Sequence, residues 1–541
     1  MKKEAKDGGG GRGHLMLLSV VVLLSILLRF YNLEAVPAWD FDEGYNMRYA
    51  FDLLNGQVLW FAIKYAFIPH PPLFFLAYAA VIKFLGVGVY TLRLLTASYG
   101  VVTTVVLYLT GREMFNRNIG LAASFIYAVT PEVVFWNRVG HANNQLMLLS
   151  ALTLYFIYRY SKTLDGRMLH LGCLAAGLSV VTEYTGLFNV AAMAVFLYLY
   201  HRRQVLKAVA FSLLPLAMLF VFMLHYSPDY FLFDLSYQLN RFFSVGKIAL
   251  AIVFALVAYR SRELAKAFYK PIAESIDQDT LVYLMVVSLV VFQTSESSFW
   301  RATSFLFVMS FFGLCLMPSF QLSKEKERRI LVLFLVFNIL SLLAFDRADH
   351  MTMVVYPFAS VAVAAMFYGI YRKSVAQLPW ILRRFRLKLS SRTLFVLAFY
   401  PVFVSLCFSS YMFLLGNFSM ENVAEDLAVA EYVNQRAGAG DLILTYSWMF
   451  PMIREARVSL LTQSIAYEGD SIAYYSGDFP PERFAFNTSY RRAKFLVASN
   501  GTLEWVLNET GLNDTVAYLE CWEETPVAGF LVYSNPEYRP A

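Results

Sequence analysis

The chain has 541 residues, of which 58% are hydrophobic and only 16% are charged. A soluble protein has about 25% charged residues, so this composition excludes an ordinary soluble enzyme and indicates a membrane protein. The net charge of +6 indicates no nucleic-acid partner, because the basic residues are distributed as membrane orientation requires. Four scattered cysteines predict neither a disulfide framework nor a metal site.

Apolar runs long enough to cross a membrane recur along most of the chain. The first, near residues 15–31, follows a basic N-terminus and lacks a small-residue cleavage site. We therefore interpret it as an uncleaved span rather than a signal peptide. We predict thirteen spans, near 15–31, 94–111, 119–136, 146–160, 168–182, 186–200, 208–225, 247–260, 280–293, 302–318, 330–345, 351–371 and 393–415.

A further apolar run, 72–88, is ambiguous by hydropathy alone, and the basic clusters decide it. If this run does not cross, later clusters such as Arg202-Arg203 and Arg328-Arg329 fall on the side of the N-terminal lysines. If it crosses, they all move to the opposite side. We therefore predict that 72–88, which the pair Pro71-Pro72 opens, lies in the outer interface.

This topology predicts three parts. Residues 1–14 form a cytoplasmic tail, and 15–418 form a transmembrane catalytic domain whose outer loop, 32–92, carries interfacial helices. Residues 419–541 have the composition of a soluble domain and lie outside. All five N-x-Ser/Thr sequons follow the last span, which agrees with this side: Asn417, Asn487, Asn500, Asn508 and Asn513. We predict a multi-pass protein of the cell (plasma) membrane.

The last part is predicted to be a small α/β domain. A helix is expected over 421–436, because two glycines stop it at Gly438 and Gly440. Short apolar segments predict three strands, over 441–446, 494–499 and 530–533, and the core of one short helix, over 503–507. No phosphate-binding glycine-rich loop occurs in this part.

The acidic stretch Asp40-Phe41-Asp42-Glu43 follows the first span directly. One interpretation is structural: the carboxylates solvate the loop, or Asp40 or Asp42 caps a helix that starts near Tyr45. The other is catalytic, because the aromatic neighbours could desolvate a carboxylate and raise its pKa towards that of a useful base.

Cations gather near span ends on the predicted outer side, where the orientation rule disfavours them. Arginine forks match phosphate oxygens, so we predict that this set binds a lipid phosphate, although any single member could be structural. The set comprises Arg93, Arg138, His141, Arg301, Arg347 and His350. His70, before Pro71-Pro72, is a weaker candidate that could equally be a satisfied interfacial residue.

Three motifs in order carry a resemblance: Asp42-Glu43 after the first span, His70-Pro71-Pro72-Leu73, and Arg93-Leu94. They resemble those of the protein O-mannosyltransferases and equally of the related aminoarabinose transferases and archaeal members. This resemblance covers roughly residues 15–200. It implies the polytopic α-helical GT-C fold and transfer of a sugar from a polyprenyl or dolichyl phosphate.

The resemblance also implies roles for the matching residues. Asp42 would be the general base, Glu43 its neighbour, and Arg93 would organise the outer cavity. Arg138 matches the family pattern, but Asn143 stands where an aspartate is expected, and Glu183 stands where a lysine is common. These departures leave the sugar and the acceptor open, and Asn143 is retained as a candidate substrate-binding residue.

The expected function is therefore inverting transfer of mannose or another hexose to a hydroxyl on a protein, glycan or lipid. Membrane lipids are the other expected partners. No metal site is predicted, although Asp42, Glu43 and His70 leave a divalent cation open. The alternative is a transporter or flippase, which the nearly charge-free spans disfavour. A receptor or scaffold that binds through its outer domain is a further alternative, and it would not need Asp42.

Overall fold

The computed structural model describes residues 10–54, 71–236, 325–384 and 420–539, apart from gaps at 35, 38, 227, 230, 233–234, 345–348, 473–476, 478 and 485. The spans predicted over 247–260, 280–293, 302–318 and 393–415 lie outside the described residues, as does Asn417. The chain divides into two compact units. The helical unit comprises Met1–Tyr31, Ala97–Asn137 and Ala142–Phe413, and the α/β unit comprises Asn32–Thr96, Arg138–His141 and Leu414–Ala541.

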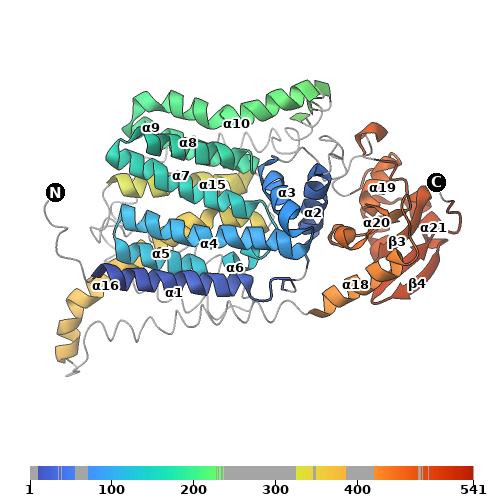
Figure 1. The fold of residues 1–541 in the computed structure, drawn as a ribbon, viewed down its shortest axis with the longest axis horizontal. Helices are drawn as coiled ribbons and strands as arrows, with labels where there is room; N and C mark the ends of the chain where they lie inside the picture. The colour runs from blue at the N-terminus through green and yellow to red at the C-terminus, as the bar shows by residue number, and fades with distance from the viewer. Residues whose placement is uncertain are drawn as a thin grey trace. The chain divides into compact units, whose positions relative to one another are not determined.

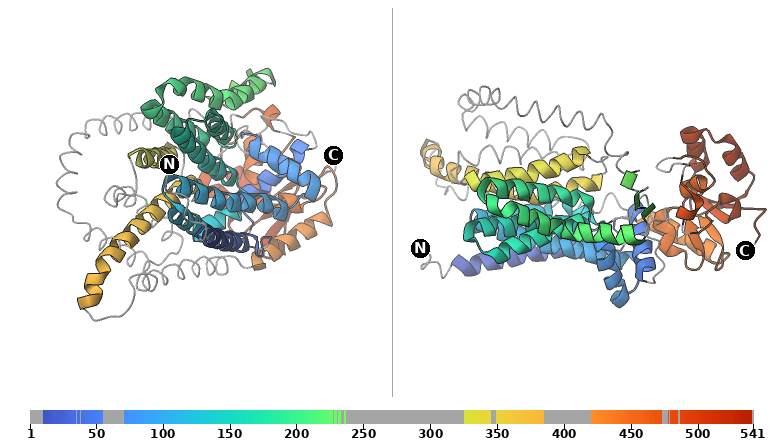
Figure 2. Two further views of the ribbon diagram at one scale, coloured as in Figure 1. Left: turned by 60° about the vertical axis from the view of Figure 1, so that its left-hand side comes forward. Right: turned by 90° about the horizontal axis from the view of Figure 1, so that it is seen from above.

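Helices of the helical unit lie side by side and roughly parallel (Figures 1 and 2). Within this unit α7 packs on α8, α8 on α10, α9 on α15, and α16 and α1 on α5. The helices are α1 (Gly10–Phe30), α4 (Val89–Met114, in this unit from Ala97), α5 (Arg117–Val129), α6 (Pro131–Asn137), α7 (Asn143–Thr163), α8 (Gly166–Val180), α9 (Leu187–Tyr200), α10 (Val205–Tyr226), α15 (Glu325–Ala344) and α16 (Tyr356–Arg384), with 3-10 turns η2 (Tyr184–Gly186), η3 (Arg202–Gln204) and η4 (Asp349–Val355).

Four described helical segments are long and apolar enough to cross a membrane, or five if the bent pair α5–α6 is one span. They are Gly13–Phe30, Val89–Met114, Arg202–Tyr226 and Thr352–Gly369. The protein is therefore an integral membrane protein, and the total of thirteen spans stays a prediction. The ambiguous run 72–88 forms α3 (Leu73–Leu85), with 13 residues. The predicted spans 168–182 and 186–200 form α8 and α9, with 15 and 14 residues, so helix length does not separate α3 from them and the interfacial placement of 72–88 stays a prediction.

A buried arginine holds the break between α5 and α6, which meet at 65°. Pro131 ends the helical hydrogen bonding, so carbonyls of the last turn of α5 need other donors. Arg29 of α1 supplies them: it donates to the carbonyl oxygens of Ala128 at 2.9 Å and Tyr127 at 3.2 Å. Its Nε donates to Asn137 Oδ1 at 2.8 Å. Arg29 therefore links the end of α5 to the end of α6.

The α/β unit combines the predicted outer loop with the C-terminal part of the chain. Its helices are α2 (Phe41–Leu54), α3, the first residues of α4, α18 (Met420–Asn434), α19 (Leu461–Tyr467), α20 (Thr502–Thr510) and α21 (Asn513–Glu520), and its 3-10 turns are η5 (Ser447–Met452), η6 (Pro481–Arg483) and η7 (Tyr490–Arg492). Its strands are β1 (Leu442–Leu444), β2 (Arg457–Ser459), β3 (Ala493–Ala498), β4 (Glu523–Val527) and β5 (Phe530–Ser534).

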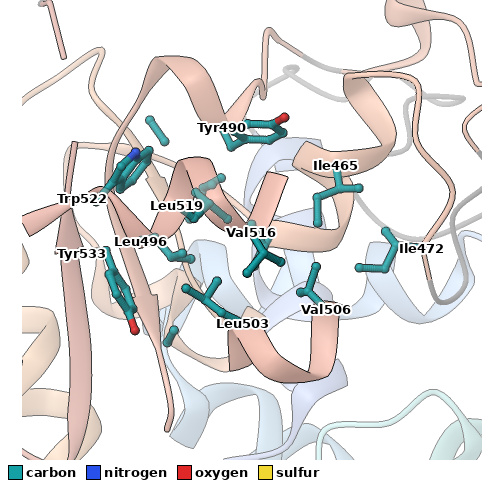
Figure 3. Packing of buried hydrophobic residues seen from close by; sticks show 14 of the residues in the cluster. Ile465, Ile472, Tyr490, Leu496, Leu503, Val506, Val516, Leu519, Trp522 and Tyr533 are labelled. Atoms are coloured by element: carbon teal, nitrogen blue, oxygen red, sulfur yellow. The ribbon is translucent and has the colours of Figure 1, made fainter. Parts of the chain in front are cut away.

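These strands form one sheet in the order β2-β1-β3-β5-β4. β1 runs parallel to β2 and β3, with Leu444 opposite Leu496, and β5 runs antiparallel to β3 and β4. Apolar side chains of β3, β5 and helices α19, α20 and α21 meet in a core (Figure 3), which includes Ile465, Leu496, Val506, Leu519 and Tyr533. The three predicted strands and both predicted helices are confirmed, whereas β2, β4, α19 and α21 were not predicted.

Candidate active site

The acidic stretch begins helix α2 through a reciprocal capping arrangement. Asp40 Oδ1 accepts a hydrogen bond from the backbone N–H of Asp42 at 3.0 Å. The backbone N–H of Asp40 donates to Glu43 Oε2, also at 3.0 Å. This is a variant of the capping box: the third helical residue, Glu43, accepts from the residue before the helix, whereas the side chain of Asp40 accepts from the second helical residue instead of the third. The structural interpretation therefore holds for Asp40, and Glu43 shares in it.

Glu43 is fully buried and makes a second set of contacts with Arg93 of α4. Arg93 Nε donates to Glu43 Oε1 at 2.7 Å and Nη2 donates to Oε2 at 2.6 Å. Arg93 Nη1 donates to the carbonyl oxygens of Leu33 and Pro37, at 3.1 and 2.8 Å. One guanidinium thus ties the helix α2 to the segment that leads into it. These contacts support a positioning role, and phosphate binding by Arg93 stays a prediction.

The loop Arg138–His141 packs against α2 and the start of α4. Gly140 is central: its N–H donates to Glu43 Oε1 at 2.8 Å, and its carbonyl oxygen accepts from Asn46 at 2.7 Å. A Cβ at this glycine would lie 2.2 Å from Leu92 Cδ2, so the close approach requires glycine. Arg138 donates to the Val36 carbonyl oxygen from Nε at 3.1 Å and from Nη2 at 2.7 Å.

Asp42 differs from its two acidic neighbours because 45% of its side chain is exposed. Its Oδ2 lies 3.8 Å from His141 Nδ1, and His141 Nε2 lies 3.0 Å from Asp40 Oδ1. Partial desolvation raises the pKa of Asp42, the charge of His141 opposes this, and the charges of Asp40 and Glu43 add to it. The structure therefore brings one accessible carboxylate next to a histidine.

His141 itself is 6% exposed. Burial would lower its pKa, but its hydrogen bond to Asp40 and the charges of Asp40, Asp42 and Glu43 outweigh burial and raise the pKa to about 9. The imidazole is therefore cationic near neutral pH. Its charge offsets part of the negative charge that Asp40 and Asp42 place at this end of α2.

The same three side chains could hold a metal ion. Asp40, Asp42 and His141 each offer one ligand atom, and these atoms lie within 4.8 Å of one another. Carboxylate oxygens with one imidazole nitrogen suit Mn²⁺ or Zn²⁺. This set differs from the combination that the sequence left open, because Glu43 already accepts four hydrogen bonds from N–H groups and His70 lies outside the described residues.

The remaining predicted residues are not placed at this cluster. Asn143 begins α7 in the helical unit and is 8% exposed. Arg301 and Arg347 lie outside the described residues, and of His350 only the backbone in η4 is described. Phosphate or substrate binding by Asn143, His70, Arg301, Arg347 and His350 thus stays a prediction.

Sequence reasoning missed the pairing of His141 with Asp40 and the roles of Asn46 and Gly140. The spacing Asp40-x-x-Glu43 is a capping-box signal, so local sequence alone could have separated these two carboxylates from Asp42. No comparable signal marks Asn46 or Gly140, because both act through backbone groups of a distant loop.

Two kinds of comparison relate this chain to known proteins. A family model described as dolichyl-phosphate-mannose-protein mannosyltransferase matches residues 69–227. The archaeal oligosaccharyltransferase AglB from Archaeoglobus fulgidus, in complex with an inhibitory peptide and a dolichol-phosphate, superposes with a TM-score of 0.58 at 13% identity, over 98% of this chain and 75% of that one. ArnT from Cupriavidus metallidurans, bound to undecaprenyl phosphate, superposes with a TM-score of 0.55 at 11% sequence identity, over 99% of this chain and 100% of that one. No curated protein matches the chain in sequence.

At these identities the structural likeness establishes the fold and leaves the reaction open. The fold is that of the GT-C membrane glycosyltransferases, which confirms the resemblance predicted from the motifs around Asp42, His70 and Arg93. The family match covers 69–227, which includes the loop Arg138–His141 and helix α4 but not Asp42.

Proposed function

We propose that the protein is a glycosyltransferase that moves a hexose, mannose first among the candidates, from a dolichyl or similar polyprenyl phosphate to an acceptor hydroxyl. The acceptor is carried by a protein, a glycan or a lipid. One observation carries the proposal: of the three carboxylates that open α2, Asp40 and Glu43 serve the fold, and Asp42 stays exposed beside His141. The family model that matches residues 69–227 supports mannose as the sugar and dolichyl phosphate as its carrier.

In this reaction Asp42 is the general base. The acceptor oxygen forms a bond to the anomeric carbon while the bond from that carbon to the phosphate oxygen breaks. The acceptor proton goes to the Asp42 carboxylate, and the bond electrons leave with the polyprenyl phosphate. Direct displacement inverts the anomeric centre. A positioned base contributes about 10²- to 10⁴-fold to such a rate.

The other residues of the cluster position this carboxylate. Glu43 and Arg93 fix the first turn of α2, and Gly140 brings the loop Arg138–His141 against it. Cationic His141 provides positive charge beside the Asp42 carboxylate. The charge that develops on the leaving phosphate is proposed to be offset by Arg301, Arg347, His350 and His70.

A second form of the site includes a divalent cation held by Asp40, Asp42 and His141, because their ligand atoms lie close enough together. Such an ion would supply Lewis-acid stabilisation of a leaving phosphate. His141 would then be a neutral ligand, and the backbone N–H of Asp40 would still donate to Glu43. Dependence of sugar transfer on added metal distinguishes the two forms.

The proposed site lies outside the membrane, with the N-terminus in the cytoplasm and the plasma membrane as the location. Residues 1–14, 15–418 and 419–541 remain the proposed topological parts. The α/β unit shows that the predicted outer loop and the C-terminal part pack as one body. This supports their placement on the same side of the membrane.

The testing experiment measures transfer of radiolabelled sugar from dolichyl-phosphate-mannose and dolichyl-phosphate-glucose by purified protein. Asp42→Asn is compared with wild type and with Glu431→Gln, a change of an exposed residue of α18. We expect Asp42→Asn to abolish transfer while donor binding and thermal unfolding stay unchanged, and Glu431→Gln to behave as wild type. Undiminished transfer by Asp42→Asn would contradict its assignment as the base.

A further inference from the structure

The helix that carries Asp42 packs against the C-terminal part of the chain, and one of its contacts there is made at a glycine. A Cβ built at Gly44 would lie 1.8 Å from the carbonyl oxygen of Ser447 and 2.8 Å from the Cα of Trp448. Both atoms belong to the backbone, so no rotamer change could relieve the contact. A glycine within a helix costs about 1 kcal/mol relative to alanine, and the close approach of η5 provides the reason for it here.

Aromatic packing continues this contact one residue further along α2. The rings of Tyr45 and Phe450 meet edge to face, with centroids 5.5 Å apart. Both side chains are buried, at 5% and 3% exposure. The backbone contact at Gly44 and the ring contact at Tyr45 therefore hold the first turn and a half of α2 against η5.

The turn η5 is itself firmly held in the C-terminal fold. Trp448 Nε1 donates to Asp426 of α18 at 3.2 Å, and Asn434 at the end of α18 donates to the carbonyl oxygen of Met452 at 2.8 Å. Just before the turn, the hydroxyl of Tyr446 accepts from the backbone N–H of Ser499 at 2.9 Å. η5 is thus anchored to α18 on one side and to the end of β3 on the other.

From these contacts we propose that η5 is a positioning element for Asp42, and that Gly44 is the residue that permits it. The inference rests on the proposed function, because it assigns η5 a part in that reaction. Asp42 precedes Gly44 by two residues in the same helical turn, so a displacement of α2 from η5 moves the carboxylate. Ordinary contact begins near 3.4 Å, so a Cβ at Gly44 would push the two backbones apart by about 1.5 Å. Misplacement by about 1 Å can cost about 100-fold in rate.

The C-terminal part of the chain thereby has a proposed positioning role. It completes the first turn of α2, so the catalytic carboxylate and η5 act as one structural piece. Asp42 is held at its other side by the capping box and by the pair of Glu43 with Arg93. Neither of these contacts replaces the seat that η5 provides.

The test compares the steady-state kinetics of Gly44→Ala with those of Gly438→Ala, in the same unit. A Cβ at Gly438 meets nothing within 4 Å, so the control adds the same methyl group without a clash. We expect Gly44→Ala to lower kcat at least about tenfold with the KM for the donor within twofold of wild type, and Gly438→Ala to match wild type. A wild-type kcat for Gly44→Ala, or a loss carried by KM alone, would overturn the proposal.

Phe450→Ala keeps the test decisive if Gly44→Ala does not fold, because it removes the ring contact without adding atoms. It is expected to lower kcat as well, with KM unchanged, and an unchanged kcat would overturn the proposal. Asp42→Asn in the same assay separates the two claims. If Asp42→Asn is inactive while Gly44→Ala is fully active, the proposed function stands and η5 has no positioning role.

An activity-independent measurement completes the design. A photoreactive benzophenone side chain is placed at Phe450 in the full-length protein, and its cross-links are mapped by mass spectrometry. Cross-links to residues 41–54 would support the packing of α2 against η5. Cross-links confined to other segments would overturn it, whatever the transfer assay shows.

Discussion

The carboxylate of Glu43 and the guanidinium of Arg93 form two parallel hydrogen bonds, at 2.7 and 2.6 Å, and both side chains are fully buried. This bidentate pair spans 50 residues of sequence and joins α2 to α4. Removing one partner of a buried pair leaves the other charge uncompensated, at a cost of about 3–5 kcal/mol. The arrangement therefore ties the stability of the α/β unit to the position of Asp42.

Glu43→Gln is expected to lower the free energy of unfolding of the α/β unit by about 3–5 kcal/mol, measured by chemical denaturation in detergent. Glu431→Gln is the matched control, because its pair with Arg454 is exposed and contributes at most about 1 kcal/mol. Arg93→Lys should also destabilise, since an ammonium cannot replace the two-pronged contact. Equal stability of Glu43→Gln and Glu431→Gln would contradict this account.

Gly140→Ala is expected to destabilise the protein by about 1–3 kcal/mol, because the added Cβ overlaps the buried Leu92 side chain. Sugar transfer should fall with it, since Gly140 holds the loop of His141 against Glu43. Gly88→Ala is the control, as its Cβ would meet only Thr91 Oγ1, at 3.9 Å.

Leu92→Ala should partly rescue Gly140→Ala by making room for the methyl group. The double variant is then expected to be more stable than the sum of the two single losses predicts, which a double-mutant cycle measures. Strict additivity would mean that Gly140 and Leu92 do not share one space.

Asp426 is expected to make stability fall as pH rises. Burial raises its pKa to about 6, its hydrogen bond from Trp448 opposes this, and Glu425 adds to the rise. The folded protein thus holds this proton more tightly than the unfolded chain, and that stabilisation, present below about pH 4, is lost as pH passes 6. After allowance for solvent screening we expect a loss on the order of 1 kcal/mol.

Asp426→Asn should remove this pH dependence between pH 4.5 and 7.5, as followed by thermal unfolding. Asp441→Asn is the contrast, because burial raises the pKa of Asp441 but the hydrogen bonds from Lys494, Tyr538 and Gly438 lower it overall. Its stabilisation is therefore lost only on acidification below about pH 4. A pH profile of Asp426→Asn identical to that of wild type would contradict the assignment.

Metal removal distinguishes the two forms of the proposed site. If Asp40, Asp42 and His141 hold a divalent cation, protein treated with a chelator loses transfer and regains it with Mn²⁺. Mn²⁺ at about 100 times its dissociation constant should also stabilise the fold by about 2.7 kcal/mol, and His141→Ala should abolish that stabilisation. Full transfer after chelation, with no thermal shift, would leave the metal-free form, with Asp42 as the base and His141 as its cationic neighbour.

The amino-acid sequence by itself determined the properties that depend on local chemistry. Apolar composition identified a membrane protein, and short apolar segments located β1, β3 and β5. The ordered motifs around Asp42, His70 and Arg93 predicted the GT-C fold. Each of these signals depends on residue types and their order along the chain, and none requires knowing which residues meet in space.

Only the tertiary structure decided which carboxylate is available and what surrounds it. Glu43 and Arg93 meet across 50 residues, and Asp40 and His141 across 101. Arg93 and Arg138 bind backbone carbonyl oxygens, which every residue has and which leave no mark in the sequence. A glycine such as Gly44 predicts a close approach but not its partner. The partner is set by how the chain packs, and here it lies some four hundred residues away, at Ser447.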